Sequence, residues 1–505
     1  MYHMEDIDIS PEDKEFAYSD TASLCANNMY NVTNFYTRNL MTGLKKKEGE
    51  RTPNEKEVIK TVEEAIPAVN KKLQATYRKK VQKIKSNKSL TKKEQEEKVS
   101  KIKCAEFTMP TADKWFAGYN LLDAVFKQTE NPDYRSHHSH VMQNAISDCT
   151  EAWTSRFNKG EGGLPKYRKS GGRSTAVFSN TACKIENGIL AFPYATVKGK
   201  KERLFMDVSK LPHASKDKLI EVRIVPCRGA YQIQIITDDG INEDDIIPKE
   251  ENIVSDNGAK GVMMLDPGLN NFATITDNKG GTPIVIKGGA IKARNQWYNK
   301  QMAGLRSKQM KGHNPKTYHP ETTRRMKSLS RKRDAFITDT FYKYVHFICR
   351  TMTERGLSYL IVGHNKGQKQ NINMGKTNQA FVAVPFSRFN TILSSTARQY
   401  GICVILQEES YTSKACFAAK DFIPTYGQED AEKAVFSGKR THRGLYRQND
   451  GKVINADVNG SANIGRKYNE EVFADVKDIG YLYKTVKAMT YRDILDVSHK
   501  YTTKK

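Results

Sequence analysis

The first third of the chain has the apolar spacing of α-helices. Residues 21–44 carry large apolar side chains at near-helical intervals, which predicts an amphipathic helix. Residues 53–103 are rich in Lys, Glu and Gln and predict one or two long exposed helices, broken around residues 86–89. We expect further helices at residues 112–128 and 138–157.

The pattern changes to alternation between residues 175 and 240, where turn signals separate short runs. The apolar residues with a period of two are Val222, Ile224, Tyr231, Ile233 and Ile235. This period is typical of a half-buried antiparallel sheet. Residues 1–20 are acidic and irregular, and they form either a separate segment or a part of this β-domain.

The second half reads as alternating strands and helices. Strands are expected at 261–266, 282–287, 357–363 and 401–409, with 282–287 as the hairpin partner of 261–266. Helices are expected at 290–312, 320–354 and 385–400. Such alternation predicts a mainly parallel or mixed sheet covered by helices on both faces.

The net charge of the chain indicates a polyanionic partner. The 505 residues include 82 Lys and Arg against 57 Asp and Glu, a formal net charge of +25. The positive side chains in such an excess repel one another unless a polyanion neutralises them. Nucleic acid is the leading candidate, because each phosphate that Lys or Arg neutralises releases a counterion and so strengthens binding. The alternative is a solvated basic surface without a partner.

The eight cysteines are scattered and form no C-x-x-C pair, which fits reduced thiols rather than a disulfide framework. No apolar run approaches the roughly 20 residues that span a bilayer, and the acidic N-terminus does not resemble a secretory signal. We therefore expect a cytoplasmic protein without membrane contact, associated with the nucleoid when it binds DNA.

Acidic residues end three of the predicted elements. Asp266 follows a buried strand, Glu408 and Glu409 end a second one, and Asp457 precedes a helix with small residues. Taken singly, each acid has an ordinary structural explanation: a turn for Asp266, a solvated strand end for Glu408 and Glu409, and a helix N-terminus for Asp457. Together they suit a phosphodiester-cleaving site, because carboxylates hold the two divalent ions, about 3.5–4 Å apart, that such hydrolysis uses.

Five motifs give a family resemblance: L-D-P-G-L-N-N-F-A-T-I-T-D, L-I-V-G-H-N-K-G-Q-K-Q, Q-E-E-S-Y-T-S-K-A, F-S-G-K-R and I-N-A-D-V-N-G-S-A-N-I. Over residues 260–467 the chain resembles the TnpB (OrfB) proteins of small bacterial transposons, a family ancestral to the type V CRISPR effectors. The resemblance implies a RuvC-like nuclease, a guide RNA, magnesium-dependent cleavage and recognition of a short motif beside the DNA target.

By position, Asp266 resembles the first catalytic acid of the family and Asp457 the third. Most relatives carry the middle acid after the strand that ends at Val362, where this chain has Gly363-His364-Asn365. Glu408 and Glu409 resemble a rearranged version on the next strand. We keep both and favour Glu409, so the expected Mg²⁺ ligands, for two ions, are Asp266, Glu409 and Asp457.

Zinc is a second departure. Many relatives carry paired cysteines before the last catalytic Asp, whereas this chain keeps only Cys416 there. One thiolate cannot complete the tetrahedral coordination of a structural zinc ion, so we expect no structural zinc and a zinc-less insert at residues 410–451.

Basic and amide side chains are expected to contact nucleic acid. On the two long helices after the first catalytic strand they would line a heteroduplex channel, and in the insert they would lie beside the active site. Those near residues 143–168 would read the target-adjacent motif. The set is Gln143, Asn144, Lys166, Tyr167, Arg168, Arg294, Arg324, Arg325, Arg331, Arg333, Lys439 and Arg440.

The expected fold class is multidomain α+β, with a helical recognition lobe, a small wedge-like β-barrel domain and an α/β RNase H-like (RuvC) nuclease domain. The expected boundaries are an N-terminal segment at 1–20, the helical domain at 21–160, the β-domain at 161–255, the nuclease at 256–409 and 452–505, and the insert at 410–451.

The resemblance implies an RNA-guided DNA endonuclease that binds guide RNA, double-stranded target DNA and its displaced strand, and we expect a monomer. The alternatives are an RNA-guided DNA-binding regulator with an inactive nuclease and a DNA-acting transposase accessory protein. The missing acid near Gly363 favours the first of these alternatives.

Overall fold

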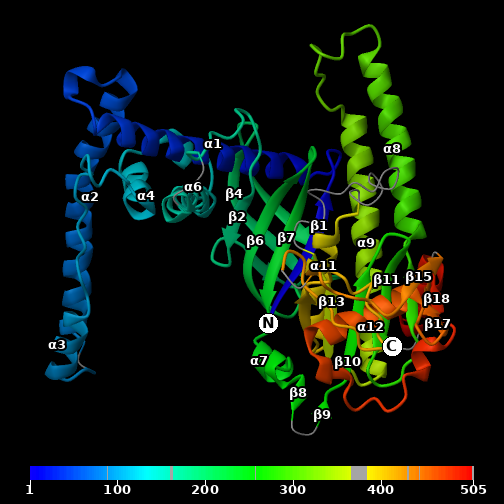
Figure 1. Cartoon of the computed structure of the whole chain (residues 1–505). Helices are drawn as coiled ribbons and strands as arrows, with labels where there is room; N and C mark the ends of the chain where they lie inside the picture. The colour runs from blue at the N-terminus through cyan, green and yellow to red at the C-terminus, as the bar shows by residue number, and fades with distance from the viewer. Residues whose placement is uncertain are drawn as a thin grey trace. The chain divides into compact units, whose positions relative to one another are not determined.

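The computed structural model describes residues 1–87, 89–159, 163–255, 258–365, 384–428, 431–442 and 444–502, and it forms two compact units (Figure 1). Unit 1 is Met1–Gly240 and unit 2 is Ile241–Lys505. The mixed α+β composition agrees with the expected fold class. The end of the motif L-I-V-G-H-N-K-G-Q-K-Q, from residue 366 onward, lies outside the described residues.

Unit 1 begins with a helical region. Its helices are α1 (Phe16–Gly43), α2 (Pro53–Lys85), α3 (Lys92–Ser100), α4 (Tyr119–Gln128), α5 (Pro132–Arg135) and α6 (Ser139–Lys159), with a 3₁₀ turn at Glu48–Glu50. The break predicted around residues 86–89 is present, and α2 and α3 each start from a threonine capping box, at Thr52 and Thr91. The helix predicted for 112–128 begins only at Tyr119, because Gly118 is its N-cap.

The β-part of unit 1 has two sheets. One has the order β1-β7-β6-β2, and the other the order β3-β4-β5. The strands are β1 (Tyr2–Ile9), β2 (Ala176–Ser179), β3 (Lys184–Glu186), β4 (Ile189–Val197), β5 (Lys200–Asp207), β6 (Lys218–Cys227) and β7 (Ala230–Asp238). The alternating residues predicted from sequence are buried: Val222, Ile224, Tyr231, Ile233 and Ile235.

The N-terminal residues are more regular than their sequence suggested. β1 pairs antiparallel with β7 along its whole length, and the N-terminal ammonium group binds Asp238 and Asp239 at 3.0 and 2.7 Å. The prediction of an irregular segment is therefore wrong for residues 2–9. Its acidic composition hid a strand with two exposed or half-exposed acids, Asp6 and Asp8, beside its apolar residues.

Unit 2 is built on a six-stranded sheet of order β14-β13-β10-β11-β12-β18. Its strands are β10 (Val262–Pro267), β11 (Asn271–Asp277), β12 (Ile284–Lys287), β13 (Tyr359–Gly363), β14 (Cys403–Gln407) and β18 (Lys487–Met489). β10, β11 and β12 pair antiparallel in sequence order, while β13 is parallel to β10 and β14 is parallel to β13.

One predicted strand pairing is wrong. Residues 282–287 were expected to form a hairpin with 261–266, but β11 lies between β10 and β12 and pairs with both. The sequence analysis missed β11, whose residues from Phe272 to Asp277 are all buried and give little alternation.

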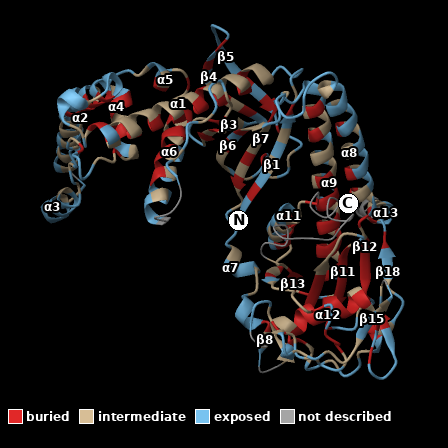
Figure 2. Ribbon diagram, turned by 45° about the horizontal axis from the view of Figure 1, so that its top comes forward, coloured by how far each residue is buried: buried red, intermediate tan, exposed pale blue. Residues whose placement is uncertain are grey.

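Helices cover this sheet. They are α8 (Gly289–Met310), α9 (Arg324–Glu354), α11 (Phe386–Gln399), α12 (Ala456–Tyr468) and α13 (Tyr491–Thr502). α12 packs on β10, β11 and β13, and both the sheet strands and α12 are largely buried (Figure 2). The opposite-facing cluster, which includes Met263, Leu265 and Leu360, packs against α9 and α11 residues such as Phe341 and Phe389.

Short elements complete unit 2. Among the described residues they are α7 (Glu243–Ile246), β8 (Val254–Ser255), β9 (Gly258–Ala259), β15 (Lys439–His442), β16 (Leu445–Arg447), β17 (Val453–Asn455) and 3₁₀ turns at Glu250–Asn252, Glu470–Phe473 and Gly480–Tyr483. β15, β16 and β17 form a small antiparallel sheet that leads into α12. No helix among the described residues is both long and apolar enough to cross a membrane.

Candidate active site

The predicted acids gather at one edge of the six-stranded sheet. β10, β13 and β14 run parallel, and their register aligns Leu265 with Val362 and Val362 with Leu406. The carboxyl ends of the three strands therefore meet at the same edge. Asp266 follows Leu265 on β10, and Glu409 lies two residues beyond the end of β14.

Asp266 lies in an environment that strongly opposes its ionisation. Burial raises its pKa well above the usual value, the nearby Glu409 and Asp457 raise it further, and Arg440 lowers it. Like charges oppose one another's ionisation, so the proton behaviour belongs to the cluster as a whole. This dependence on both partners brings Asp266, Glu409 and Asp457 into one electrostatic group.

Glu409 is held over the end of β13. Asn365 Nδ2 donates to Glu409 Oε1 at 3.1 Å, and Asn365 Oδ1 accepts from the Glu409 backbone N–H at 3.3 Å. A Cβ at Gly363 would overlap Oε2 of Glu409 and lie 2.8 Å from Ile464 Cδ1. The carboxylate of Glu409 thus occupies the space that a side chain on β13 would need, which explains the glycine at this position.

Glu408 points to a different partner. Its Oε1 accepts from the Ser410 backbone N–H at 2.7 Å, and its Oε2 binds Lys467 Nζ. Burial alone would raise the pKa of Glu408, but the Lys467 and Ser410 contacts outweigh it and lower that pKa below the usual value. Lys467 is 5% exposed and also donates to Ser410 O and Pro424 O, so Glu408 belongs to a structural contact and not to the acidic group.

Asp457 lies in the first turn of α12. Asn455 caps the helix by accepting from the Asp457 and Val458 backbone N–H groups at 2.9 and 3.2 Å. Asn271 Nδ2, at the start of β11, donates to Asp457 Oδ2 at 2.6 Å. Lys287 Nζ donates to Asn271 Oδ1 at 3.0 Å and so fixes the orientation of that amide.

Arg440 reaches the same group from β15. Its Nη2 donates to Asp457 Oδ1 at 2.7 Å, and both side chains are partly exposed. One oxygen of Asp457 therefore faces Asn271 while the other faces a cation that solvent reaches. One turn further along α12, Gly460 leaves room for Asp266, since a Cβ there would lie 3.1 Å from Asp266 Oδ2.

The donor set fits hard divalent cations. All three side chains offer carboxylate oxygens, which hard cations prefer. Burial and mutual repulsion disfavour their negative charges, and Arg440 is the cation of the protein that partly compensates them. Within the described part of the chain, the three acids do not form a cluster whose ligand atoms all lie within 4.8 Å.

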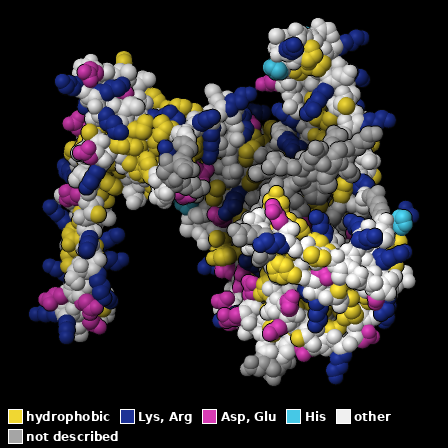
Figure 3. Space-filling view, viewed as in Figure 1, with side chains coloured by type: hydrophobic (Ala, Val, Ile, Leu, Met, Phe, Trp, Pro, Cys, Tyr) yellow, Lys and Arg dark blue, Asp and Glu magenta, His cyan; other side chains and the backbone are white. Residues whose placement is uncertain are grey.

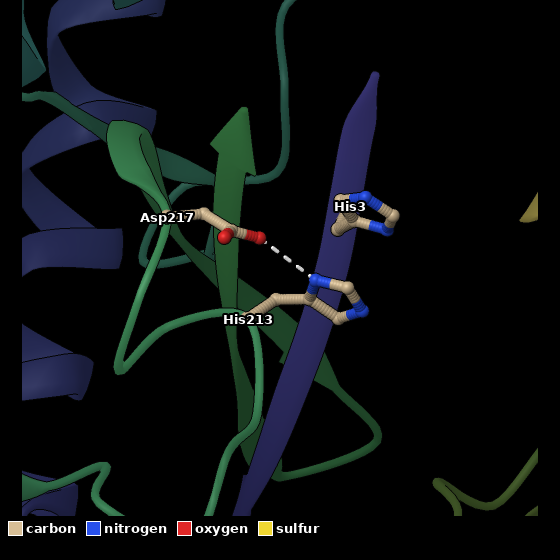
Figure 4. A group of neighbouring side chains, drawn as sticks. All are labelled: His3, His213 and Asp217. Atoms are coloured by element: carbon tan, nitrogen blue, oxygen red, sulfur yellow. Dashed lines mark hydrogen bonds and ion pairs between the residues drawn. The ribbon is translucent and has the colours of Figure 1, made fainter. Parts of the chain in front are cut away.

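The described residues contain one tighter group, His3, His213 and Asp217, in unit 1 (Figure 4). The two imidazoles stack with centroids 3.6 Å apart and planes 8° from parallel. His3 Nε2 is bonded to Asp239 at 2.8 Å and His213 Nδ1 to Asp217 at 2.8 Å. A metal lies close to the plane of each imidazole that binds it, and these parallel planes do not meet. We therefore assign the group to the docking of β1 on the 213–217 turn.

The insert is organised around Asp421. Its Oδ2 accepts from the backbone N–H groups of Cys416 and Ser437 at 2.7 and 2.9 Å, and its Oδ1 accepts from Ser437 Oγ at 2.7 Å. Cys416 is fully buried in an apolar cluster with Phe417 and Tyr446. Hydrogen bonds to one carboxylate thus join residues 416 and 437 of this segment.

The basic residues expected on α8 and α9 fall into two groups. Arg294 donates to Lys332 O at 3.0 Å and lies over the Trp297 and Phe336 rings, and Arg333 donates to Asn295 Oδ1 at 2.8 Å. These two side chains join the helices to each other. Arg324 and Arg325 are exposed at the start of α9, and Arg331 is half-buried. Many other Lys and Arg side chains stand out along α8 and α9 and along α2 and α3 (Figure 3).

The residues expected to read a target-adjacent motif lie on α6 and on the segment after it. Gln143 and Asn144 are half-buried, and Asn144 Nδ2 donates to His140 O at 2.9 Å. Lys166 and Tyr167 are exposed. Arg168 is packed at 3.6 Å over the ring of Tyr30, so it is less available than its neighbours.

A row of amides on α1 fixes the backbone of that segment. Asn27, Asn31 and Asn34 donate to the carbonyl oxygens of Lys169, Arg168 and Pro165. Because these amides hold the main chain, the side chains of Lys166 and Tyr167 remain directed outward. Lys439, like Arg440, is exposed on β15.

Sequence reasoning missed the amides that position the acids. Asn271, Asn365 and Asn455 each bond to an acid or to its backbone, but only the carboxylates were singled out as candidate site residues. The signal available for Asn365 was its place two residues after Gly363, where a buried strand ends.

Two family models match unit 2. Residues 250–369 match the OrfB_IS605 model, described as a probable transposase, and residues 386–464 match the Cas12f1-like TNB domain. These matches confirm the resemblance to the TnpB (OrfB) family and to the type V effectors over the segments that contain Asp266, Glu409 and Asp457. A comparison with curated proteins finds no match.

Solved structures with similarity to the chain include type V effectors. A Cas12f1–sgRNA–target DNA complex is 14% identical, covers 82% of this chain and 94% of its own, and gives a TM-score of 0.31. The mini-RNA-guided endonuclease CRISPR-Cas_phi3 is 10% identical, covers 92% of each chain and gives 0.35. Alicyclobacillus acidoterrestris C2c1 with single-guide RNA is 10% identical, covers 84% and 73%, and gives 0.38.

Proposed function

We propose that the protein is an RNA-guided DNA endonuclease that cleaves both DNA strands at a single RuvC-like site. The observation that carries the proposal is the electrostatic group of Asp266, Glu409 and Asp457 at one sheet edge, inside segments that match OrfB_IS605 and Cas12f1-like TNB. The sheet order supports an RNase H-like assignment, since three antiparallel strands are followed by two parallel strands on the side of the first.

The proposed domains follow the expected boundaries. Residues 256–409 and 452–505 would form the nuclease, 410–451 its zinc-less insert, and 21–160 and 161–255 the recognition and wedge-like parts. The compact units divide at Gly240, so residues 241–255 pack with the nuclease side of the chain.

The chain's own residues would prepare the site for two Mg²⁺. Asp266, Glu409 and Asp457 would hold the ions, which supply Lewis acidity for activating water and stabilising charge on the attacking and leaving oxygens. Asn365 orients Glu409, and Asn271 with Lys287 orients Asp457. Arg440 forms an ion pair with Asp457 and, released from it, would face the negatively charged phosphodiester.

The net charge of +25 supports guide RNA and double-stranded DNA as partners. Lys166 and Tyr167, held outward by the amides of α1, are our candidates for reading a motif beside the target. Arg324, Arg325 and Lys439 are candidates for backbone contacts, because they are exposed.

The alternative of a guided regulator with an inactive nuclease depended on the missing acid after β13. Glu409 fills the space above Gly363, so a third carboxylate stands beside Asp266 and Asp457 without an acid on that strand. This arrangement favours an active nuclease.

The test is to purify the protein after expression with its flanking genomic DNA and to sequence the RNA that accompanies it. The complex is then given Mg²⁺ and plasmid libraries with randomised sequence beside a matching target. We expect guide-directed double-strand cleavage that disappears in Asp266→Ala. Binding without cleavage would instead establish the regulator, and protein free of RNA that acts on DNA would favour a transposase accessory role.

A further inference from the structure

We propose that the outer face of the β4–β5 hairpin is a stacking platform for unpaired bases of the guide RNA. The inference rests on the proposed function, because it names a site at which the RNA of that function would be held. The platform consists of Tyr194, Lys201, Arg203 and Phe205 in unit 1.

One face of the hairpin packs into the core of unit 1, and the other face is exposed. Leu190, Phe192, Val197, Leu204 and Met206 point into the core of unit 1. On the outer face, Tyr194 is 56% and Phe205 50% exposed. Single exposed apolar residues are ordinary, but two neighbouring aromatic rings on one sheet face require a reason.

The backbone directs these rings outward together. The β4–β5 register shifts between Ala191 and Tyr194, and after this bulge Tyr194 lies opposite Arg203, while Ala191 lies opposite Phe205. A bulge redirects the side chain that follows it. The turn that joins the strands, Lys198-Gly199, has positive φ at both residues, as the tight turns of two-residue hairpins require.

Arg203 is fixed between the two rings. Its Nε donates to Phe192 O at 2.8 Å, and its guanidinium lies 5.5 Å from the Tyr194 centroid and 5.1 Å from the Phe205 centroid. Lys201 Nζ lies 5.0 Å from the Tyr194 centroid. The hairpin therefore presents aromatic and guanidinium planes in a held orientation, with little conformational entropy left to lose on binding.

This chemistry fits a nucleotide strand with exposed bases. Aromatic rings and arginine planes stack on bases of any sequence, and neighbouring cations neutralise the phosphates. Around the platform, Lys198 and Lys200 add to Lys201 and Arg203, against two acids on the same hairpin, Glu202 and Asp207. Side chains two positions apart on a strand, such as Arg203 and Phe205, are about 6.6 Å apart, which suits successive bases of an extended strand.

Among the partners of the proposed function, RNA is the one that offers unpaired bases in the resting complex. The target DNA arrives as a duplex, in which base faces are stacked and paired. We therefore assign the platform to an unpaired segment of the guide RNA and not to DNA.

The experiment compares the full-length wild-type protein with Tyr194→Ala/Phe205→Ala. Filter binding measures the affinity for the RNA that copurifies with the wild type, over a range of salt concentrations. Stacking contributes about 1–3 kcal/mol per base, so we expect a loss of about 5-fold to 150-fold for each base that leaves the platform. The salt dependence should stay close to that of the wild type, because no cation is removed.

Matched variants separate stacking from a loss of structure. Tyr194→Phe/Phe205→Tyr keeps both rings and should retain wild-type affinity, and Tyr2→Ala removes a 68% exposed ring on β1 of the other sheet and should have no effect. In RNA carrying 2-aminopurine at unpaired positions, quenching at one or two positions should be present in the wild type and absent in the double alanine variant.

Three outcomes would overturn the platform. These are an unchanged RNA affinity in the double alanine variant, a ring-conserving variant that loses affinity as strongly, and a loss confined to single-stranded DNA of the same sequence. A wild-type protein that carries no RNA and binds none would overturn the proposed function itself, so the two failures are distinguishable.

Discussion

Asn365 holds Glu409 at two points, with its Nδ2 on the carboxylate and its Oδ1 on the backbone N–H of the same residue. This arrangement fixes both the position and the rotation of a side chain that lies beyond the end of its strand. It explains how a glutamate beyond the end of β14 reaches the group that includes Asp266, although β13 lies between β14 and β10.

The first prediction concerns Asn365. Asn365→Ala should raise the Mg²⁺ concentration needed for half-maximal cleavage about 10-fold to 100-fold, as for other partners that orient metal ligands. Cleavage rates measured over a Mg²⁺ titration test this, with the melting temperature as a control for folding. An equal fall in rate at every Mg²⁺ concentration would argue against a positioning role.

The second prediction separates the two adjacent glutamates. Glu409→Gln should lower the single-turnover cleavage rate by at least about 100-fold, because it removes a charged ligand from the metal site. Glu408→Gln should keep most of the rate and lower thermal stability instead, since it weakens the contact with the buried Lys467. The reverse pattern would mean that Glu408 is the catalytic residue.

The third prediction follows from the raised pKa of Asp266. Because the folded protein binds this proton more tightly than the unfolded chain, Asp266 reduces stability as the pH rises above the ordinary Asp value of about 3.8 towards the raised pKa. Asp266→Asn should therefore raise the melting temperature of the metal-free protein at neutral pH by a few degrees.

That gain should shrink towards pH 4 and also on addition of Mg²⁺, which stabilises only the wild-type acid. Differential scanning calorimetry with and without EDTA provides the measurement. A variant less stable than the wild type at every pH would contradict the assigned repulsion.

The fourth prediction concerns the relay from Lys287 through Asn271 to Asp457. Asn271→Leu should weaken Mn²⁺ binding about tenfold or more, measured by calorimetric titration, because Asp457 loses the bond that orients it. Lys287→Met should have a smaller effect in the same direction, and Lys287→Arg should restore part of it. An unchanged Mn²⁺ affinity in Asn271→Leu would remove Asn271 from the site.

The fifth prediction concerns the zinc-less insert. Asp421→Ala should destabilise the protein by about 1–3 kcal/mol, since it leaves the backbone N–H groups of Cys416 and Ser437 without their acceptor. Elemental analysis should find zinc well below one equivalent, and a zinc chelator should not change the melting temperature. Stoichiometric zinc would overturn this account of the insert.

The sequence alone determined the elements and the chemical types at their ends. The spacing of apolar residues distinguished helices from strands, because buried side chains recur every 3.6 residues in a helix and every 2 in a strand. An acid directly after a buried strand stood out because burying a charge is unfavourable unless the charge is paired. Asp266 and Asp457 could be identified in this way. β11 could not, since a strand that is almost fully buried lacks clear alternation, and the alternation of Asp6-Ile7-Asp8-Ile9 in β1 was masked by its acidic composition.

Tertiary structure decided what depends on neighbours distant in the chain. Alternation along β14 left Glu408 and Glu409 on opposite faces, but only the packing of α12 and β13 put Lys467 beside one and Asn365 beside the other. The glycine at 363 likewise has its reason in a carboxylate 46 residues away. Sequence period fixes which face a side chain takes, whereas the partners it meets there are set by the pairing and packing of separate segments.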